Sequence, residues 1–205
     1  MSWLDGSELL STARERTGLS DFGPDDFLEG LDVLVRGLNT EAGIREDRWQ
    51  QVREQRILRL LINRLWFEKD LKEHPEILDE ALAAPIIITG LVRTGSTKLH
   101  RILAATGSFQ VLRFWSANMF ARIPGEPDGG RERRIRETRE LEQWMYATSP
   151  SIHQGHPLYT DEAEEDQFLM EATFRHPLIF GLFESPYYGQ WIMQADMRPT
   201  FDYFL

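Results

Sequence analysis

The sequence predicts an α/β fold with a P-loop-like parallel sheet core and an extended helical N-terminal region. Four strand-favouring residues, 86–89, run into a glycine-bounded loop that an amphipathic segment follows. The first 80 residues carry apolar side chains at helical spacing. A parallel sheet needs several strands, and only one is clear, so we expect the sheet core to be incomplete in this chain. We therefore divide the chain into a helical region, 1–84, and the N-terminal part of an α/β domain, 85–205.

The helical region is predicted from its caps and its periodicity. Asp5 and Glu8 are spaced as a capping box for a helix that ends at Gly18. Apolar residues recur at helical spacing over 27–38 and again over a longer helix, 44–71, and a short helix is expected at 77–82. These helices carry no catalytic pattern, so we assign them to packing or to a partner surface through which an oligomer can form.

Beyond the amphipathic segment the pattern is mixed. Residues 109–115 suggest a second strand, 124–130 a loop, and 131–146 a charged helix. The arginines of that helix alternate with glutamates, which is typical of a solvated face. An acidic run, 161–166, leads into a further helix, and Asp161 with Glu164 has the spacing of a capping box.

Composition excludes several classes of function. The 205 residues carry a net charge of −10, which disfavours extended contacts with nucleic acid or anionic membranes. No cysteine is present, so disulfides and thiolate chemistry are excluded. No apolar run approaches the roughly 20 residues that span a bilayer, and no secretory signal is visible, so we expect no membrane span and a cytoplasmic location.

The loop after residues 86–89 has the chemistry of an anion site. Gly90 and Gly95 have the spacing of a Walker A loop, and the amides of the loop and of the following helix N-terminus suit a phosphate. The residue after Gly95 is Ser96 rather than lysine, and the cation lies inside the loop, at Arg93. A P-loop kinase or nucleotide hydrolase, which needs that lysine, is therefore the less favoured alternative.

Residues 86–104 resemble the 5′-phosphosulfate-binding loop of the bacterial sulfotransferase family, whose loop has the form Gly-Leu-Pro-Arg-Ser/Thr-Gly-Thr-Thr. Residues 74–77 and 156–166 also look like segments of that family. The sequence departs from the pattern at Val92, where the family has proline, at Ser96, where it has threonine, and at Lys98, where it has an apolar residue.

The resemblance implies transfer of a sulfuryl group from 3′-phosphoadenosine 5′-phosphosulfate to a hydroxyl or amine of a small-molecule acceptor. The acidic run 161–166 could be a metal site, but no histidine lies near it in helical register, so we expect no metal. The resemblance also implies that the donor is bound by loop residues: Gly90, Arg93, Thr94, Gly95, Ser96 and Thr97. Arg93, which stays protonated, would be a fixed clamp on the reacting oxygens. The family's arginine and serine for the donor's 3′-phosphate have no match, so we expect its C-terminal part to be missing here. An inactive fragment or interaction module that retains the loop is the alternative.

The catalytic base is not fixed by a motif. His156, in the family-like segment, is our first choice, and His153 lies three residues before it. Glu162 or Glu165 of the acidic run is an alternative source of a base. His74 and His176 precede prolines and are assigned to element boundaries.

Overall fold

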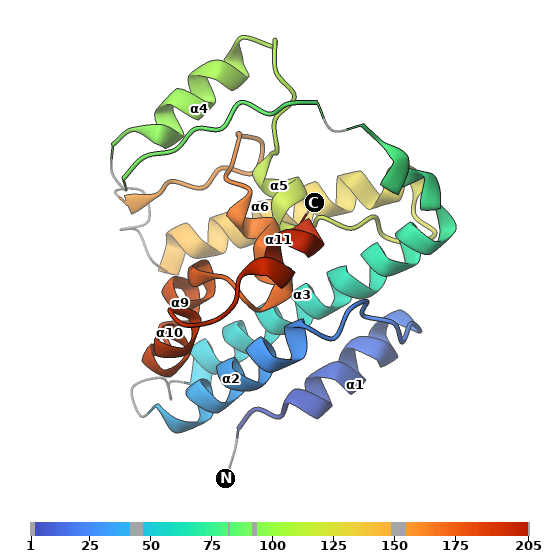
Figure 1. The fold of residues 1–205 in the computed structure, drawn as a ribbon, viewed down its shortest axis with the longest axis vertical. Coiled ribbons are helices and arrows are strands. Elements are labelled where there is room, and N and C mark those ends of the chain that lie inside the picture. Colours follow the sequence, from blue (N-terminus) through green and yellow to red (C-terminus); the bar gives the residue numbers. More distant parts are fainter. Residues whose placement is uncertain (1–2, 42–46, 82, 92–93, 149–154, 205) are drawn as a thin grey trace. The chain divides into compact units, whose positions relative to one another are not determined.

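The computed structural model describes residues 3–41, 47–81, 83–91, 94–148 and 155–204. Its described residues fold into helices joined by loops (Figure 1), in this order: α1 (Gly6–Thr17), α2 (Phe27–Thr40), α3 (Asp47–Glu73), η2 (Pro75–Asp79), α4 (Ser96–Ala105), α5 (Phe114–Asn118), η3 (Pro127–Gly130), α6 (Arg131–Thr148), α8 (Gln167–Met170), η4 (Glu171–Thr173), α9 (Pro177–Phe183), α10 (Pro186–Ile192) and α11 (Arg198–Phe204). Within the described ranges, no helix has both the length and the apolar character that a membrane crossing requires.

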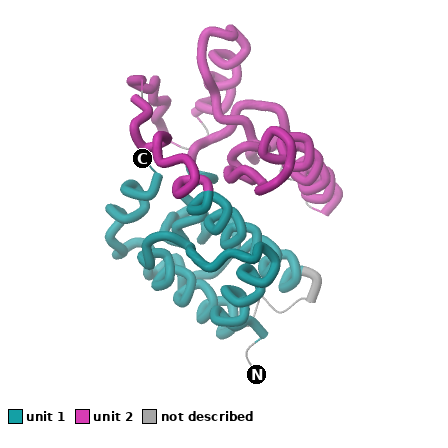
Figure 2. The backbone as a smooth tube through the Cα atoms, turned by 90° about the vertical axis from the view of Figure 1, so that its right-hand side faces the viewer, with its two compact units in different colours: residues 1–69, 167–205 teal, residues 70–166 magenta. Residues whose placement is uncertain are grey.

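The chain divides into two compact units, which Figure 2 shows in different colours. Unit 1 contains residues 1–69 and 167–205, and unit 2 contains residues 70–166. The domain boundary that the sequence suggests, between residues 84 and 85, was placed just before the loop motif, and it stays a prediction.

Unit 1 holds the larger apolar core. Helix α2 packs against α1, α10 and η4, and its apolar stripe is buried together with Ile57, Leu61 and Leu65 of α3. Helix α1 begins where the Asp5 carboxylate accepts the amides of Ser7 and Glu8, and it ends at a left-handed Gly18. The capping role of Asp5 and the end at Gly18 are therefore confirmed, because an acidic N-cap and a C-terminal glycine satisfy the free groups of the helix ends.

In unit 2, helix α6 contacts both α5 and the residues that follow α5. Helix α5 packs on α6, and the Arg134 guanidinium of α6 donates to the carbonyls of Met119 (2.7 Å) and Phe120 (3.2 Å). Arg134 is buried, so the prediction of a wholly solvated arginine face is wrong at this position. The guanidinium also lies over the ring of Trp115, with 4.9 Å between its carbon and the ring centroid.

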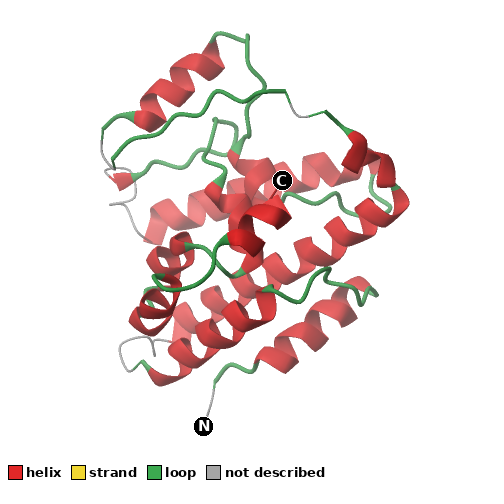
Figure 3. Ribbon diagram, in the orientation of Figure 1, coloured by secondary structure: helices red, strands yellow, loops and turns green. Residues whose placement is uncertain are grey.

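The expected parallel sheet core is wrong for this chain. Among the described residues, helices and loops account for the structure and no sheet is formed (Figure 3). Residues 85–89 carry no regular secondary structure, and Ile86 and Ile87 are 64% and 77% exposed. The physical reason is that a strand is stabilised only by a neighbour that takes up its backbone N–H and C=O groups, and no described segment lies beside 85–89 in that way.

The second expected strand, 109–115, is also corrected. Arg113 forms a single antiparallel bridge with Ala163, and Phe114 already begins α5. Nearby backbone hydrogen bonds run from Phe114 to Glu162 (3.1 Å), from Trp115 to Thr160 (3.1 Å) and from Glu164 to Leu112 (2.9 Å). The segment from 160 to 164 is thus fixed to the start of α5 without forming a ladder, which places the acidic run in a defined position.

Candidate functional site

The phosphate-loop motif lies at the start of α4. Its described residues include Gly90, Thr94 and Gly95, whereas Val92 and Arg93 lie outside the described residues. The Thr94 hydroxyl donates to the carbonyl of Leu91 (2.6 Å) and so closes the loop on itself. A Cβ at Gly90 would lie 3.1 Å from that hydroxyl oxygen, which is tighter than ordinary contact. Glycine at 90 therefore leaves room for the hydrogen bond that shapes the loop.

Gly95 turns the chain into α4. Its φ of 95° lies in a region that L-residues rarely adopt, and as the N-cap of α4 it has no side chain to accept from the first turn. No acidic residue stands in that turn, and Ser96 and Thr97 are partly exposed. The amides and the positive end of the helix dipole are consequently not neutralised by a capping carboxylate, which is the arrangement that accepts an anion.

His156 lies in an ion-pair cluster that the sequence did not predict. Its Nε2 is 2.8 Å from Oε1 of Glu164, and its Nδ1 is 4.0 Å from Oε1 of Glu165. The Glu164 side chain is 1% exposed, while that of His156 is 34% exposed. A buried carboxylate therefore holds one nitrogen of the ring, and the rest of the ring reaches the surface.

The same carboxylate joins His156 to the helix of the phosphate loop. Arg101 of α4 places its Nη2 3.8 Å from Oε2 of Glu164 and donates to the carbonyl of Pro157 (2.7 Å). Arg101 is five residues after Ser96, or about 7.5 Å along the axis at about 1.5 Å per residue. The loop helix and the His156 segment are thus linked through one arginine and one glutamate.

Helix α6 holds this segment from another direction. The Tyr146 hydroxyl donates to the carbonyl of Leu158 (2.6 Å), and the Glu142 carboxylate accepts both the amide and the hydroxyl of Thr160, each at 2.6 Å. Contacts from α4, α5 and α6 therefore fix the short stretch that follows His156. These contacts hold the residues next to His156 in place, as a positioned acid–base group requires.

The environment raises the pKa of His156 above its ordinary value. The hydrogen bond to Glu164 is the largest cause, and the negative charges of Glu164 and Glu165 act in the same direction. Partial burial of the ring and the positive charge of Arg101 oppose the rise. The ring can therefore hold a proton at a pH where an exposed histidine has lost it.

The cluster also has a geometry that invites a metal interpretation. His156, Glu164 and Glu165 each offer one ligand atom within 4.8 Å of the others. The guanidinium of Arg101 already faces the Glu164 carboxylate, and its charge opposes a second cation at the same oxygen. We therefore assign the three side chains to an ion-pair network, and the absence of a metal from the reaction stays a prediction.

The predicted capping box is wrong, and its failure explains why Glu164 was missed. Helix α8 begins only at Gln167, so Asp161 and Glu164 are outside it. The Asp161 carboxylate instead pairs with Arg139 (2.7 Å), and Glu164 is buried. The only signal in the sequence is that a carboxylate follows His156 by eight residues, and local spacing cannot show that a non-helical segment brings the two together.

His74 and His176 agree with their expected roles at element boundaries. His74 is the N-cap residue of η2 and pairs with Glu76 (3.1 Å). His176 is the N-cap residue of α9, and its Nδ1 accepts the amide of Leu178 (3.2 Å). His153 lies outside the described residues.

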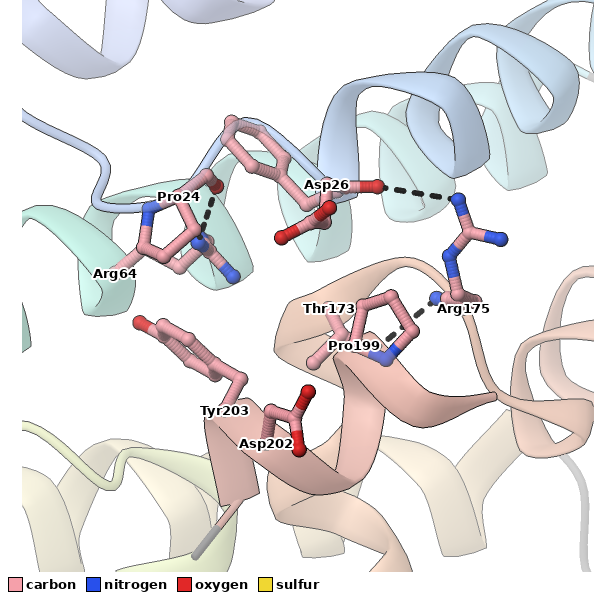
Figure 4. A pocket seen from close by; sticks show the side chains of 9 residues that line it. Pro24, Asp26, Arg64, Thr173, Arg175, Pro199, Asp202 and Tyr203 are labelled. Carbon is pink, nitrogen blue, oxygen red and sulfur yellow. Dashed lines mark hydrogen bonds between the residues drawn. The ribbon is translucent and has the colours of Figure 1, made fainter. Parts of the chain in front are cut away.

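Unit 1 contains a separate hollow of about 240 Å³ (Figure 4). Arg64 and Tyr203 lie on one side and Arg175 on the other, with the Asp202 side chain projecting from α11. Arg64 donates to the carbonyls of Phe22, Pro24 and Ala172, so its guanidinium is used for holding the chain together. Because the charged side chains of the hollow are of both signs, it does not match the anion chemistry of the loop.

Comparison with known proteins agrees with the loop. A model of the sulfotransferase family matches residues 85–202, more than half of the chain. The crystal structure of sulfotransferase STF1 from Mycobacterium tuberculosis H37Rv is similar, with 30% identity and a TM-score of 0.77 over 99% of this chain and 56% of that one. Sulfotransferase STF9 from Mycobacterium avium has the same fold, with 24% identity and a TM-score of 0.77 over 97% of this chain and 51% of that one.

No curated protein is significantly similar to the chain. The chain spans about half the length of the two solved structures that it matches. The chain nevertheless has the fold of the matching part of those structures, although its described residues form no sheet. The family match includes the whole phosphate loop and the His156 segment. The chain belongs to the sulfotransferase family, as the resemblance of its loop predicts.

Proposed function

We propose that this chain provides the 5′-phosphosulfate-binding half of a sulfotransferase site. The donor is 3′-phosphoadenosine 5′-phosphosulfate, and the acceptor is a hydroxyl or amine of a small molecule. The observation that carries the proposal is the start of α4, where a glycine-bounded loop meets a helix N-terminus whose N-cap is glycine and whose first turn holds no acidic residue. A loop of this kind suits the 5′-phosphate of the donor better than a neutral or cationic ligand.

The loop residues take separate roles in this proposal. The amides from Gly95 to Thr97 bind the 5′-phosphate, and the hydroxyls of Ser96 and Thr97 donate to its oxygens. The Thr94 hydroxyl shapes the loop through Leu91. Arg93 stabilises the negative charge that grows on the bridging oxygen as the S–O bond breaks. Arginine keeps its proton throughout, so it cannot also be the acid or the base.

His156 is the proposed base for the acceptor. Transfer breaks the acceptor O–H or N–H bond and the donor S–O bond and forms a new bond to sulfur, so one proton must leave the acceptor. His156 is partly exposed, and Arg101 and Glu164 link its segment to the loop helix. A base fixed to the donor helix can be placed near the acceptor whenever the donor is bound.

Nucleotide binding to the 205-residue chain tests the donor. 3′-Phosphoadenosine 5′-phosphate should raise the melting temperature, and a ligand at 100 times its Kd stabilises by about 2.7 kcal/mol. ATP with magnesium should have a clearly smaller effect. The reverse order would support a kinase or nucleotide hydrolase, and no response to either would support a non-catalytic module that retains the loop.

A matched pair of variants tests the clamp. Arg93→Ala should lower sulfuryl transfer on the order of 10²–10³-fold, as the loss of a preorganised donor does. Lys98→Ala removes an exposed cation from the helix that follows the loop and should change the rate little. Full activity in Arg93→Ala would remove the clamp role.

A further inference from the structure

We propose that Glu164 is the positioning residue of the site, which holds the proton of His156 on Nε2 and leaves Nδ1 as the nitrogen that accepts the proton of the acceptor. The inference deepens the proposed function and rests on it for the catalytic meaning of His156. Its structural content, the proton on Nε2 and the accepting role of Nδ1, can be tested without any reaction.

The hydrogen-bond directions at Glu164 support the first half of this assignment. Oε1 receives the backbone N–H of Glu165 (2.9 Å), which can only donate, and it lies 2.8 Å from Nε2 of His156. Oε2 is buried and has no hydrogen-bond partner among the described residues, and the Arg101 guanidinium lies 3.8 Å from it. A carboxylate that pairs with a guanidinium acts only as a hydrogen-bond acceptor. Nε2 must then be the donor.

The second half follows from the two nitrogens of a neutral imidazole. When Nε2 carries the hydrogen, Nδ1 has the lone pair and is the only basic atom of the ring. Nδ1 is 4.0 Å from Oε1 of Glu165, whose side chain is 34% exposed, as is that of His156. Nδ1 therefore faces a partly exposed side chain, whereas Nε2 faces the buried Glu164.

The charges around the ring favour the protonated product of the step. The acceptor's O–H or N–H proton goes to Nδ1 while its electron pair forms the bond to sulfur, and the donor's bridging oxygen keeps the electrons of the broken S–O bond. The resulting imidazolium is flanked by Glu164 and Glu165, and among the charged groups of the described residues Arg101 opposes it. Glu164 has the stronger effect because it is buried and in hydrogen-bond contact, whereas Glu165 is more distant and exposed.

Nitrogen-15 NMR of the histidine rings tests the assignment directly on the 205-residue chain. In the neutral form His156 should show a protonated Nε2 and an unprotonated Nδ1, with a pKa above about 6.5, the ordinary value for histidine. A protonated Nδ1 in the wild-type chain would overturn the inference. This measurement needs no variant, so it remains decisive if a substitution at Glu164 prevents folding.

Two neighbouring substitutions provide the matched comparison. Glu164→Gln keeps the size of the side chain and removes the charge, so the pKa of His156 should fall markedly. Glu165→Gln is the control and should lower it less, because its carboxylate is exposed and 4.0 Å away. The ring resonances of His74, which pairs with Glu76 elsewhere in the chain, should keep their wild-type chemical shifts in both variants, which reports an intact fold. An equal or larger effect of Glu165→Gln would contradict the inference.

Kinetics then separate the inference from the proposed function. In Glu164→Gln the acidic limb of the kcat profile should move to lower pH, and kcat on the plateau should fall by at most the factor of about 10²–10⁴ that a general base supplies, with the donor KM unchanged. If the ring has the expected protonation but His156→Ala keeps full transfer activity, the base role is wrong and the positioning of the ring stands. If transfer requires His156 but Nδ1 carries the proton, the inference is wrong and the proposed function stands.

Discussion

The carboxylate of Glu171 is held by the guanidinium of Arg56 through contacts of 2.7, 2.8 and 3.1 Å. Glu171 is 1% exposed and begins η4, whereas Arg56 belongs to α3, so the pair fastens two segments of unit 1 that are 115 residues apart. The neighbouring Arg59 is partly buried, and the desolvation of its guanidinium lowers its pKa to about 9. The charge of Glu171 thus stands beside two arginines in a part of the unit with little access to water.

Glu171→Ala should destabilise the protein strongly. Removing one partner of a buried ion pair leaves an uncompensated charge, which typically costs about 3–5 kcal/mol. Urea unfolding followed by circular dichroism measures this loss. Arg36→Ala is the control, because Arg36 pairs with Asp32 on the surface (side chains 64% and 56% exposed) and should change stability by less than about 1 kcal/mol. Equal losses of unfolding free energy in the two variants would mean that the buried ion pair contributes no more to stability than the surface pair.

The contribution of Arg64 to stability should depend on the shape of its guanidinium as much as on its charge. Its guanidinium donates to three backbone carbonyls and lies 4.3 and 4.1 Å from the ring centroids of Phe27 and Tyr203. Lysine keeps the charge but lacks the planar fork that reaches several acceptors at once. Arg64→Lys should therefore lose about 2 kcal/mol or more, as buried carbonyls lose their donors. A chemical unfolding midpoint close to that of the wild type would show that charge alone is sufficient.

The sequence predicted local features of the fold well, because caps and breakers act over a few residues. Asp5, Gly18 and the periodic apolar residues of α2 are examples in which the expected role is the observed one. The helix expected at 131–146 is α6, with a boundary two residues later. Family membership was predicted from the phosphate loop, which is a compact motif read from adjacent residues.

The parts that were missed depend on contacts between distant residues. The strand character of Ile86 and Ile87 is a local preference, but a sheet requires partner segments, and the described chain supplies none beside them. Glu164 was assigned to a helix cap by its spacing, whereas its position is set by its contacts with His156 and Arg101. Arg101 was not singled out at all, since one arginine within an amphipathic helix has no distinguishing pattern.

Substitutions of the two glycines that flank α4 should distinguish an effect on the geometry of the phosphate loop from an effect on the stability of the protein. Gly95 and Gly107 both have positive φ (95° and 69°), and an added Cβ at either would meet no atom within 4 Å. Alanine at either position should therefore cost only backbone strain, about 1–2 kcal/mol. Only Gly95→Ala alters the turn that aims the amides at the proposed phosphate.

Calorimetric titration with 3′-phosphoadenosine 5′-phosphate measures the consequence. Affinity should fall in Gly95→Ala and remain near the wild-type value in Gly107→Ala, with similar losses of stability in both. Weakening of equal size in the two variants would place the effect in the whole helix and not in the loop.

The stability of the protein should depend on pH through His156. The folded-state pKa of this ring lies above its unfolded value because Glu164 and Glu165 favour the charged form. A group of this kind contributes its full stabilisation below the unfolded pKa of about 6.5, and the contribution is lost as the pH rises through the folded pKa. The free energy of unfolding attributable to His156 should therefore decrease across that interval.

Urea unfolding at a series of pH values, compared between the wild type and His156→Gln, isolates this contribution. Glutamine can still donate to Glu164 but does not titrate, so the difference between the two curves reports the ionisation of His156 alone. The difference should be largest at the acidic end of the interval and shrink toward alkaline pH. A difference that is constant with pH, or that grows as the pH rises, would show that the Glu164 carboxylate does not favour the charged ring.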